Sequence, residues 1–250
     1  MDISAVGVLL DEEFASDIAL EAKARGLTVA LAIERADQEV FELEYGDDYL
    51  THLGRFDPQL PKVLIRHNVE SDRTGLDEQL RRLRRVSDEL HGSGWPLLLE
   101  LLVPPTEAQL ESLGGDMRTY DEQRRPSLTL QAVEEIRDAG VHVDRWKVEG
   151  MYSRADAGSL AAACGSGGGA NCLVLGRNAP WEEVELWLSN AASCPGYDGF
   201  AVGRTLWWEP ARAVLAGTST WDDGVEVIAR NYRRAIDIYE NARSAVIQAP

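Results

Sequence analysis

Short apolar runs alternate with amphipathic stretches through the whole chain. Seven apolar runs have the length of buried strands, at Val6–Leu10, Thr28–Ile33, Lys62–Arg66, Pro96–Val103, Arg145–Glu149, Cys172–Leu175 and Gly199–Val202. Stretches with apolar residues at helical spacing follow them, for example at Ser16–Arg25, Leu76–Leu90, Leu128–Ala139, Ala155–Ala163, Trp181–Ala192 and Gly224–Ala242. This alternation predicts an α/β fold in which crossover helices connect parallel strands.

The predicted strands suit a TIM-type (β/α) barrel. Most of them are nearly continuous apolar runs, which is typical of strands that are covered on both faces. The 250 residues suit such a barrel, which needs about 250 residues, and no break in composition divides residues 1–250 into two domains. A glycine-rich nucleotide fingerprint is missing after the first strand, which argues against a Rossmann fold. The glycine-rich stretch 165–169 is expected to be a loop.

The number of predicted strands is one short of a closed barrel, which has eight. Either one strand is hidden in the pattern, or the barrel is open and a neighbouring subunit seals it. An open edge exposes unpaired backbone groups, which proteins usually cover. The sequence therefore predicts a homo-oligomer.

The net charge and the composition argue against several classes of partner and of protein. The net charge of −17 repels nucleic acid and anionic membranes, so neither is an expected partner. No apolar stretch approaches the ~18 residues of a membrane span, and no signal peptide is recognisable. Three cysteines without a CxxC pair argue against a disulfide framework. We expect a reduced, cytoplasmic protein.

Lys147 is the first candidate for chemistry. Only three of the 25 basic residues are lysines, and Lys147 lies in the middle of a predicted strand. Because strand residues alternate faces, Lys147 and Glu149 point into the barrel if Trp146 and Val148 pack under helices. A desolvated lysine has a lowered pKa and can act as an amine nucleophile that forms an iminium with a ketone. The alternative is a Lys147–Glu149 salt-bridge network that only fills the barrel.

Glu100 interrupts the apolar run Leu97–Val103. A buried carboxylate is costly unless it is paired or used, so Glu100 is a candidate general acid or base. It can equally be the partner of an interior arginine such as Arg66.

Polar residues gather where the predicted strands end. Arg66 and Asn68 end the third strand, Glu34 follows the second, and Asp11 ends the first. Active sites of (β/α) barrels are built at the carboxyl ends of the strands, so these residues are candidates for substrate binding. Each of them can also simply cap the following helix.

The last two predicted strands end in the same dipeptide, at Gly176-Arg177 and Gly203-Arg204. Glycine lets the backbone approach an anion closely, and arginine adds a charged fork. Loops after the last strands of such barrels often bind phosphate. The alternative is that both arginines pair with surface acids. None of the four histidines has another His or Cys at ligand spacing, so no metal site is expected.

Several segments occur in an order that resembles a known family: Phe41–Asp48, Lys62–Asn68, Glu100–Pro105, Trp146–Gly150, Val174–Arg177 and Gly199–Thr205. They resemble the 2-deoxy-5-ketogluconate 6-phosphate aldolase domain of inositol catabolism, which is related to the tagatose-bisphosphate and sulfofructose-phosphate aldolases. These are Schiff-base (β/α)₈ enzymes. The family's opening strand has no counterpart here, since the chain starts where the second strand would be.

The resemblance implies the roles of individual residues. Lys147 would form the iminium, and Glu100 would handle protons. The phosphate would be held by the two Gly-Arg pairs, Gly176, Arg177, Gly203 and Arg204. The reaction would split 6-phospho-5-dehydro-2-deoxygluconate into dihydroxyacetone phosphate and malonate semialdehyde, without a metal or other cofactor.

Two other functions remain open from the sequence. A barrel that lacks a strand can bind a sugar phosphate without catalysing a reaction. A sugar-phosphate isomerase or epimerase could use Glu100 and Glu149 as acid and base.

Overall fold

The protein is built around a single parallel sheet. The computed structural model describes residues 3–166 and 169–247. The strands pair in the order of the sequence: β1 (Gly7–Asp11), β2 (Thr28–Ala32), β3 (Leu60–Arg66), β4 (Leu98–Leu102), β5 (Arg145–Glu149), β6 (Asn171–Leu175) and β7 (Tyr197–Ala201). All neighbours are parallel. The predicted fold class and the seven predicted strands are therefore confirmed.

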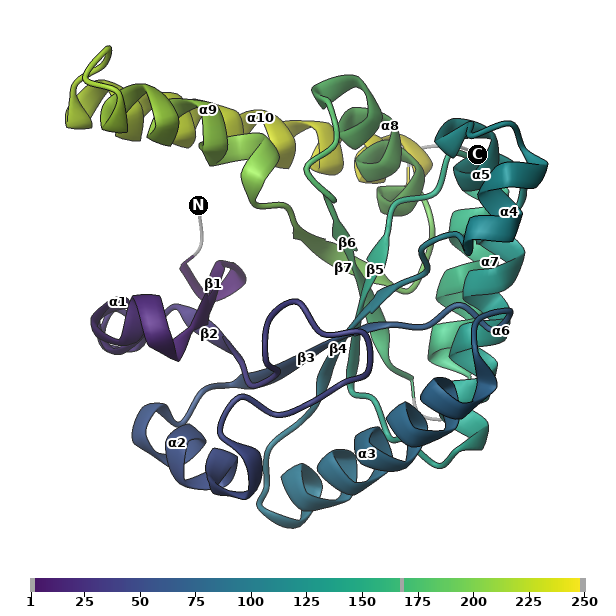
Figure 1. Ribbon diagram of the computed structural model, residues 1–250. Helices are drawn as coiled ribbons and strands as arrows, with labels where there is room; N and C mark the ends of the chain where they lie inside the picture. Colours follow the sequence, from purple (N-terminus) through teal and green to yellow (C-terminus); the bar gives the residue numbers. More distant parts are fainter. Residues whose placement is uncertain (1–2, 167–168, 248–250) are drawn as a thin grey trace.

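The sheet curls into an open barrel (Figure 1). In the part of the chain that the structure describes, β1 and β7 are the two edges and do not pair with each other. The helices lie on the convex side of the sheet, as crossover connections require. The barrel thus has an open seam between β1 and β7, where a closed barrel would have one more strand.

Helices connect and follow the strands: α1 (Glu12–Ala24), α2 (Tyr49–Phe56), α3 (Arg73–Gly92), α4 (Glu107–Ser112), α5 (Met117–Gln123), α6 (Arg125–Asp138), α7 (Arg154–Gly165), α8 (Trp181–Ala192), α9 (Arg204–Leu215) and α10 (Trp221–Ile247). Short 3₁₀ helices lie at Ile3–Ala5 and Gly46–Asp48. The stretch 165–169, expected to be a loop, includes residues 167 and 168, which lie outside the described residues. Among the described helices, none is long and apolar enough to cross a membrane.

The apolar pattern did not predict α2, α4, α5 and α9. The first three have six to eight residues, which is too short to show a helical period, and α4 is defined instead by its Thr106/Gln109 capping box. Helix α9 contains Pro210, a residue that usually interrupts a helix, and it buries only Leu206.

Alternation along the strands separates two environments. Trp146 and Val148 are buried on the convex side, where Trp146 lies beside Val133 of α6 and Ala163 of α7. The intervening residue Lys147 therefore points to the inside of the barrel, as the sequence predicts. Val63, Ile65, Leu99 and Leu101 continue the apolar layer under the helices. The inner faces of β3 and β4 carry Lys62 and Glu100 next to leucines.

The chain leaves β5 through Gly150, which lies directly against Trp187 of α8. A Cβ atom at Gly150 would come within 2.2 Å of the Trp187 side chain, and Trp187 is almost fully buried. The same glycine accepts a hydrogen bond at its carbonyl oxygen from Nη2 of Arg125, at 2.9 Å. Glycine is thus required here by space, and this contact fixes the chain just beyond Glu149.

We expect Gly150→Ala to lower the free energy of unfolding by about 1–3 kcal/mol, because the added methyl group overpacks a filled site. Urea denaturation followed by circular dichroism measures this. Gly54→Ala is the matched control, since an added Cβ there meets nothing within 4 Å and an exposed helical glycine gains up to about 1 kcal/mol on replacement by alanine. Equal stability of the two variants would contradict the packing argument.

Candidate active site

Four charged side chains of alternating sign cross the inside of the barrel from the end of β2 to β5. We call Glu34, Lys62, Glu100 and Lys147 the charge row. Glu100 and Lys147 are register partners on β4 and β5, and Nζ of Lys147 donates to Oε1 of Glu100 at 2.7 Å. Nζ of Lys62 lies 3.2 Å from Oε2 of Glu100 and also donates to Oε1 of Glu34. Each inner charge is therefore held between two of opposite sign.

The charge row is almost completely removed from solvent. Lys62 is 4% exposed, Glu100 7% and Lys147 8%. Buried charges are tolerated when each has a partner of opposite sign in good geometry. Every charged group of the row has such a partner, and only one of its polar atoms lacks a hydrogen bond. Oε2 of Glu34 is buried and has no hydrogen-bond partner among the described residues.

The two lysines of the row differ in how many carboxylates they meet. Burial lowers the pKa of Lys147, the neighbouring ammonium of Lys62 lowers it further, and Glu100 offsets only part of this. Burial also opposes the charged form of Lys62, but Glu34 and Glu100 on its two sides outweigh burial and raise its pKa. The row thus keeps Lys62 protonated and makes Lys147 the lysine that gives up its proton more easily.

The two carboxylates of the row, Glu34 and Glu100, likewise differ in the number of lysines that they meet. Burial raises the pKa of Glu34, and Lys62 offsets this only in part. Burial acts on Glu100 too, but Lys62 and Lys147 outweigh it and lower its pKa. Moving one proton from Lys147 to Glu34 would leave the net charge of the row unchanged. The unpartnered Oε2 of Glu34 offers a place for that proton, so the row can hold a neutral amine at one end and a neutral acid at the other.

A second charged group lies at the carboxyl ends of β5 and β6. We call Asp121, Arg125, Glu149 and Arg177 the arginine cluster. Arg177 donates through Nη1 to Oδ1 of Asp121 at 2.9 Å and to Oε1 of Glu149 at 2.8 Å. Arg125 donates through Nε to Asp121 at 2.9 Å, and the backbone N–H of Val103 donates to Oε2 of Glu149 at 2.8 Å. Glu149 is therefore hydrogen-bonded through both carboxylate oxygens, to a residue that follows β6 and to one that follows β4.

Asp121, Arg125 and Glu149 are as buried as the charge row, whereas the Arg177 side chain is 30% exposed. Arg125 is fully buried, and its Nη1 lies 4.0 Å from Oε2 of Glu149, too far for a hydrogen bond. Burial would raise the pKa of Asp121, but Arg177 and Arg125 outweigh it and lower that pKa. The cluster is thus a connected set of acidic and basic side chains that meets β5 two residues beyond Lys147, at Glu149.

The structure corrects three details of the sequence interpretation. Glu100 does not pair with Arg66; its partners are Lys62 and Lys147, because Arg66 is exposed at the strand end and donates to the carbonyl oxygen of Gln38. Lys147 pairs with Glu100 across the sheet, whereas Glu149 pairs with Arg177. Lys62 lies within β3, and the sequence did not reveal its position between the carboxylates of Glu34 and Glu100.

The remaining candidate residues lie near the carboxyl ends of the strands but contact neither charged group directly. Asp11 caps α1 by accepting from the backbone N–H of Phe14 at 2.9 Å. Asn68 is buried and donates to Pro104 and Gln109. Gly203 precedes α9 as its N-cap residue. Arg204 is exposed and makes no ion pair with any residue in the described ranges.

Gly176 has a packing role as well. A Cβ atom at this position would come within 2.6 Å of Val202, the residue that follows β7. The glycine therefore lets the chain after β6 lie close to the chain after β7, which brings the two Gly-Arg pairs to adjoining strand ends.

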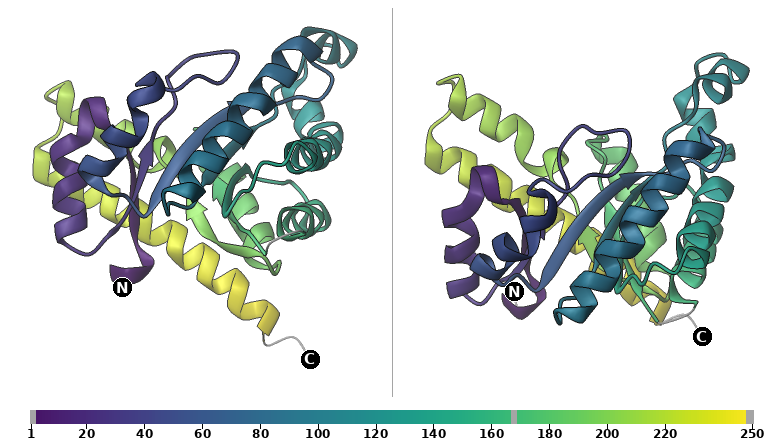
Figure 2. Two further views of the ribbon diagram at one scale, coloured as in Figure 1. Left: turned by 90° about the horizontal axis from the view of Figure 1, so that it is seen from below. Right: turned by 60° about the horizontal axis from the view of Figure 1, so that its bottom comes forward.

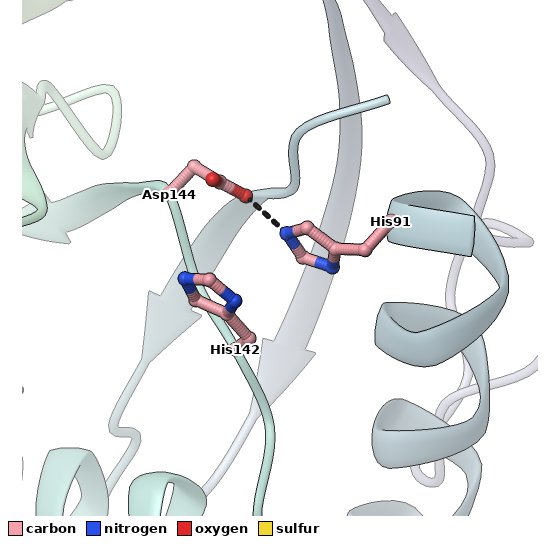
Figure 3. A group of neighbouring side chains, drawn as sticks. All are labelled: His91, His142 and Asp144. Carbon is pink, nitrogen blue, oxygen red and sulfur yellow. Dashed lines mark hydrogen bonds and ion pairs between the residues drawn. The ribbon is translucent and has the colours of Figure 1, made fainter. Parts of the chain in front are cut away.

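Potential metal ligands meet at the opposite end of the barrel, where β4 and β5 begin. His91, His142 and Asp144 have ligand atoms within 4.8 Å of one another, a grouping that their spacing in the sequence did not reveal. Figure 3 shows Nε2 of His91 bonded to Asp144, at 2.8 Å. The two imidazole rings stack 4.5 Å apart at an angle of 5°. A metal ion lies in the plane of each imidazole that binds it, so one ring would have to turn before both could bind the same ion.

Solved structures share this fold at low sequence identity. A fructose-bisphosphate aldolase from Plasmodium falciparum aligns with a TM-score of 0.65 and 10% identity over 95% of this chain and 77% of its own. A Schiff-base-forming fructose-1,6-bisphosphate aldolase aligns at 0.55 and 14% over 85% and 78%. A protein from Corynebacterium glutamicum aligns at 0.58 and 19% over 90% and 70%. These likenesses establish an aldolase-like barrel fold.

Comparison with curated proteins gave no match. A family model described as "Uncharacterized protein conserved in bacteria (DUF2090)" matches residues 2–243. This match includes every strand and both charged groups, and the chain therefore belongs to the DUF2090 family.

Proposed function

We propose that this protein is a class I aldolase that cleaves a phosphorylated keto sugar or keto acid through a Schiff base on Lys147. The observation that carries the proposal is the position of Lys147 in the barrel. It is a buried lysine with a lowered pKa, hydrogen-bonded to one carboxylate and close to a second ammonium. Amines activated by burial and a neighbouring cation are those that attack carbonyl groups at neutral pH.

The charge row contains the groups that such a reaction needs. The neutral amine of Lys147 attacks the ketone carbon, and the carbonyl oxygen leaves as water after it gains two protons. The resulting iminium accepts the electron pair of the bond between its α and β carbons as that bond breaks. The hydroxyl group on the β carbon loses its proton at the same time, which releases an aldehyde and leaves an enamine. Glu100, in contact with Nζ of Lys147, is placed to exchange protons in these steps. Protonation of the enamine carbon and addition of water return the ketone product and the free lysine.

Lys62 has a distinct part in this proposal. Its ammonium, kept protonated by Glu34 and Glu100, holds Glu100 ionised and disfavours a second positive charge on Lys147. An aldolase that used Lys62 as its nucleophile would need to deprotonate the lysine that has two acidic partners. The arrangement therefore favours Lys147.

The substrate that the sequence resemblance implies is 6-phospho-5-dehydro-2-deoxygluconate, and we propose this class of phosphorylated keto acid. Arg204, exposed beside Gly203 at the start of α9, has a guanidinium that is free to meet a phosphate. Arg177 is held by Asp121 and Glu149, so two carboxylates already neutralise its charge and make it the weaker candidate for phosphate. Arg66 and Asn68 would contact the rest of the substrate.

The first test traps the intermediate. We expect dihydroxyacetone phosphate and borohydride to leave a reduced adduct on Lys147, detected by peptide mass spectrometry, because reduction converts the iminium into a stable amine. Lys147→Met should lose the adduct completely. The chain has only two other lysines, so Lys23→Met serves as a control that should leave trapping unchanged.

An adduct on Lys62 would exclude the assignment of the nucleophile. Proton exchange from deuterated water without carbon–carbon cleavage would instead support an isomerase that uses Glu100 and Glu149. Cleavage activity that a chelator abolishes would contradict the Schiff-base mechanism.

The trapping rate should rise with pH as Lys147 loses its proton. Because the pKa of Lys147 lies below the ordinary value of 10.5, we expect the half-maximal rate below pH 10.5. Lys62→Met removes a neighbouring positive charge and leaves Glu100 with Lys147 alone, so both changes raise the pKa of Lys147. The midpoint should then move to higher pH, and the rate at neutral pH should fall about tenfold for each unit by which the pKa of Lys147 rises.

The measurement is trapping with cyanoborohydride between pH 6 and pH 11, on variants whose circular dichroism matches that of the parent protein. A midpoint that stays in place in Lys62→Met would show that Lys62 does not tune Lys147.

A further inference from the structure

The last two helices form an arm that extends beyond the sheet. The second half of α10 packs on the barrel, where Ala235 and Tyr239 are buried and the Tyr239 hydroxyl donates to the carbonyl oxygen of Tyr197. The first half of α10 and the whole of α9 project past β7 (Figures 1 and 2). We call residues 204–230 the arm.

Close packing and a hydrogen bond hold the two helices of the arm together. Gly224 of α10 lies so close to α9 that a Cβ atom would come within 2.6 Å of Val214. Asn231 ties the two helices by donating to the carbonyl oxygen of Leu206 at 2.7 Å. The arm is therefore a rigid helical hairpin.

Large apolar side chains are exposed along this rigid arm. Leu215 is 88% exposed and Trp221 74%, and Trp208 is about half exposed. The other members of this group are Trp207 and Val225. Tryptophan is among the residues most enriched at the energetic centres of protein interfaces.

The opposite side of the open seam is apolar as well. Phe14 of α1 is 80% exposed and Ile18, one turn further along the same face, is about half exposed, whereas the half-exposed Leu20 points to another face of the helix. Leu9 points from β1 toward the inside of the barrel and is also exposed. In all three views, α1 and the free end of the arm lie on the same side of the molecule (Figures 1 and 2).

The exposed apolar area of the arm, α1 and Leu9 is large enough for a protein interface. With about 150–250 Å² for a whole aromatic side chain, the exposed parts of these residues total on the order of 900 Å². This total is shared between the arm and the residues of α1 and β1, which lie on opposite sides of the seam. It is close to the ~800 Å² that each partner contributes to a standard interface.

We propose that a second copy of this chain covers the seam, with the arm of each copy packed against α1 and β1 of the other. One chain carries both the projecting arm and the uncovered strand edge, so a single two-fold contact buries both surfaces twice. The contact also covers the free edge of β1. In the described part of the chain, β1 pairs with β2 on one side and with no strand on the other. This inference does not depend on the proposed reaction.

The charge of the chain gives the dimer a specific salt response. Each copy carries a net charge of −17, so two copies repel each other at long range. Added salt screens that repulsion. The dissociation constant should therefore fall as salt is raised from 50 to 500 mM, whereas binding of a basic partner would weaken.

Sedimentation equilibrium of the full chain tests the proposal. We expect a dimer, at twice the chain mass of 27.6 kDa, in the micromolar range. Trp221→Glu and Phe14→Glu should each raise the dissociation constant about 30-fold or more, the effect of losing an interfacial hot spot. Met117→Glu on α5 is the matched control, because Met117 is an exposed apolar residue on another side of the barrel, and should remain dimeric. A monomer in the parent protein at 100 μM, or dimers that survive both seam substitutions, would overturn the proposal.

Cross-linking tests which surfaces meet. A mixture of Phe14→Cys chains and Trp221→Cys chains of different mass should form a mixed disulfide under mild oxidation with copper phenanthroline. The native cysteines are all buried, so background is low. Met117→Cys mixed with Trp221→Cys should give no mixed product. A mixed product in this control pair as abundant as in the test pair would overturn the proposed arrangement.

Discussion

The structure depends on the burial of four alternating charges inside the barrel. A buried ammonium or carboxylate is unfavourable by itself, and becomes tolerable only when a partner of opposite sign is held at hydrogen-bonding distance. Glu100 meets this condition twice, with Lys147 at 2.7 Å and Lys62 at 3.2 Å. The register of β3, β4 and β5 sets those distances, so the sheet and the charge row stabilise each other. A one-residue shift of β4 would turn Glu100 into the helix layer and leave both lysines without it.

The chemistry follows from an imbalance within this row. Four charges in a line give the inner two residues two opposite neighbours and the outer two only one. Lys62 therefore stays an ammonium, whereas Lys147, at one end, has a lowered pKa. Glu34, at the other end, has a raised one. The position of a residue in the row thus decides which group loses or gains a proton, without any strained backbone or special solvent.

Much of this arrangement could be predicted from the sequence, and the limit has a physical cause. Period-two alternation places Lys147 and Glu149 on the inside of β5 once Trp146 is assigned to the helix layer, and the isolated Glu100 is conspicuous in its apolar run. Those predictions need only local information. The pairing of Lys62 with Glu34 and Glu100 depends on register between strands, which the sequence does not encode locally. The scarcity of lysine was the one available signal for it.

The arginine cluster shows the same limit more strongly. Asp121 and Arg125 belong to α5 and the start of α6, which carry no apolar period that would mark their place above β5. Arg125 is fully buried, although a sequence with so many arginines gives no reason to single it out. The Gly176-Arg177 pair was recognised, but as an anion site, because only the structure reveals two carboxylates within reach of Arg177.

The open seam links the two proposals in physical terms. The charge row begins at the end of β2, next to the edge strand β1, and reaches inward to Lys147 on β5. Burial is the main cause of the raised pKa of Glu34, and β1 is the only strand in the described ranges between β2 and the seam. In the proposed dimer the partner covers that edge. The surface that would hold two copies together therefore lies beside the end of the row where burial raises the pKa of Glu34, and far from Lys147 at the other end.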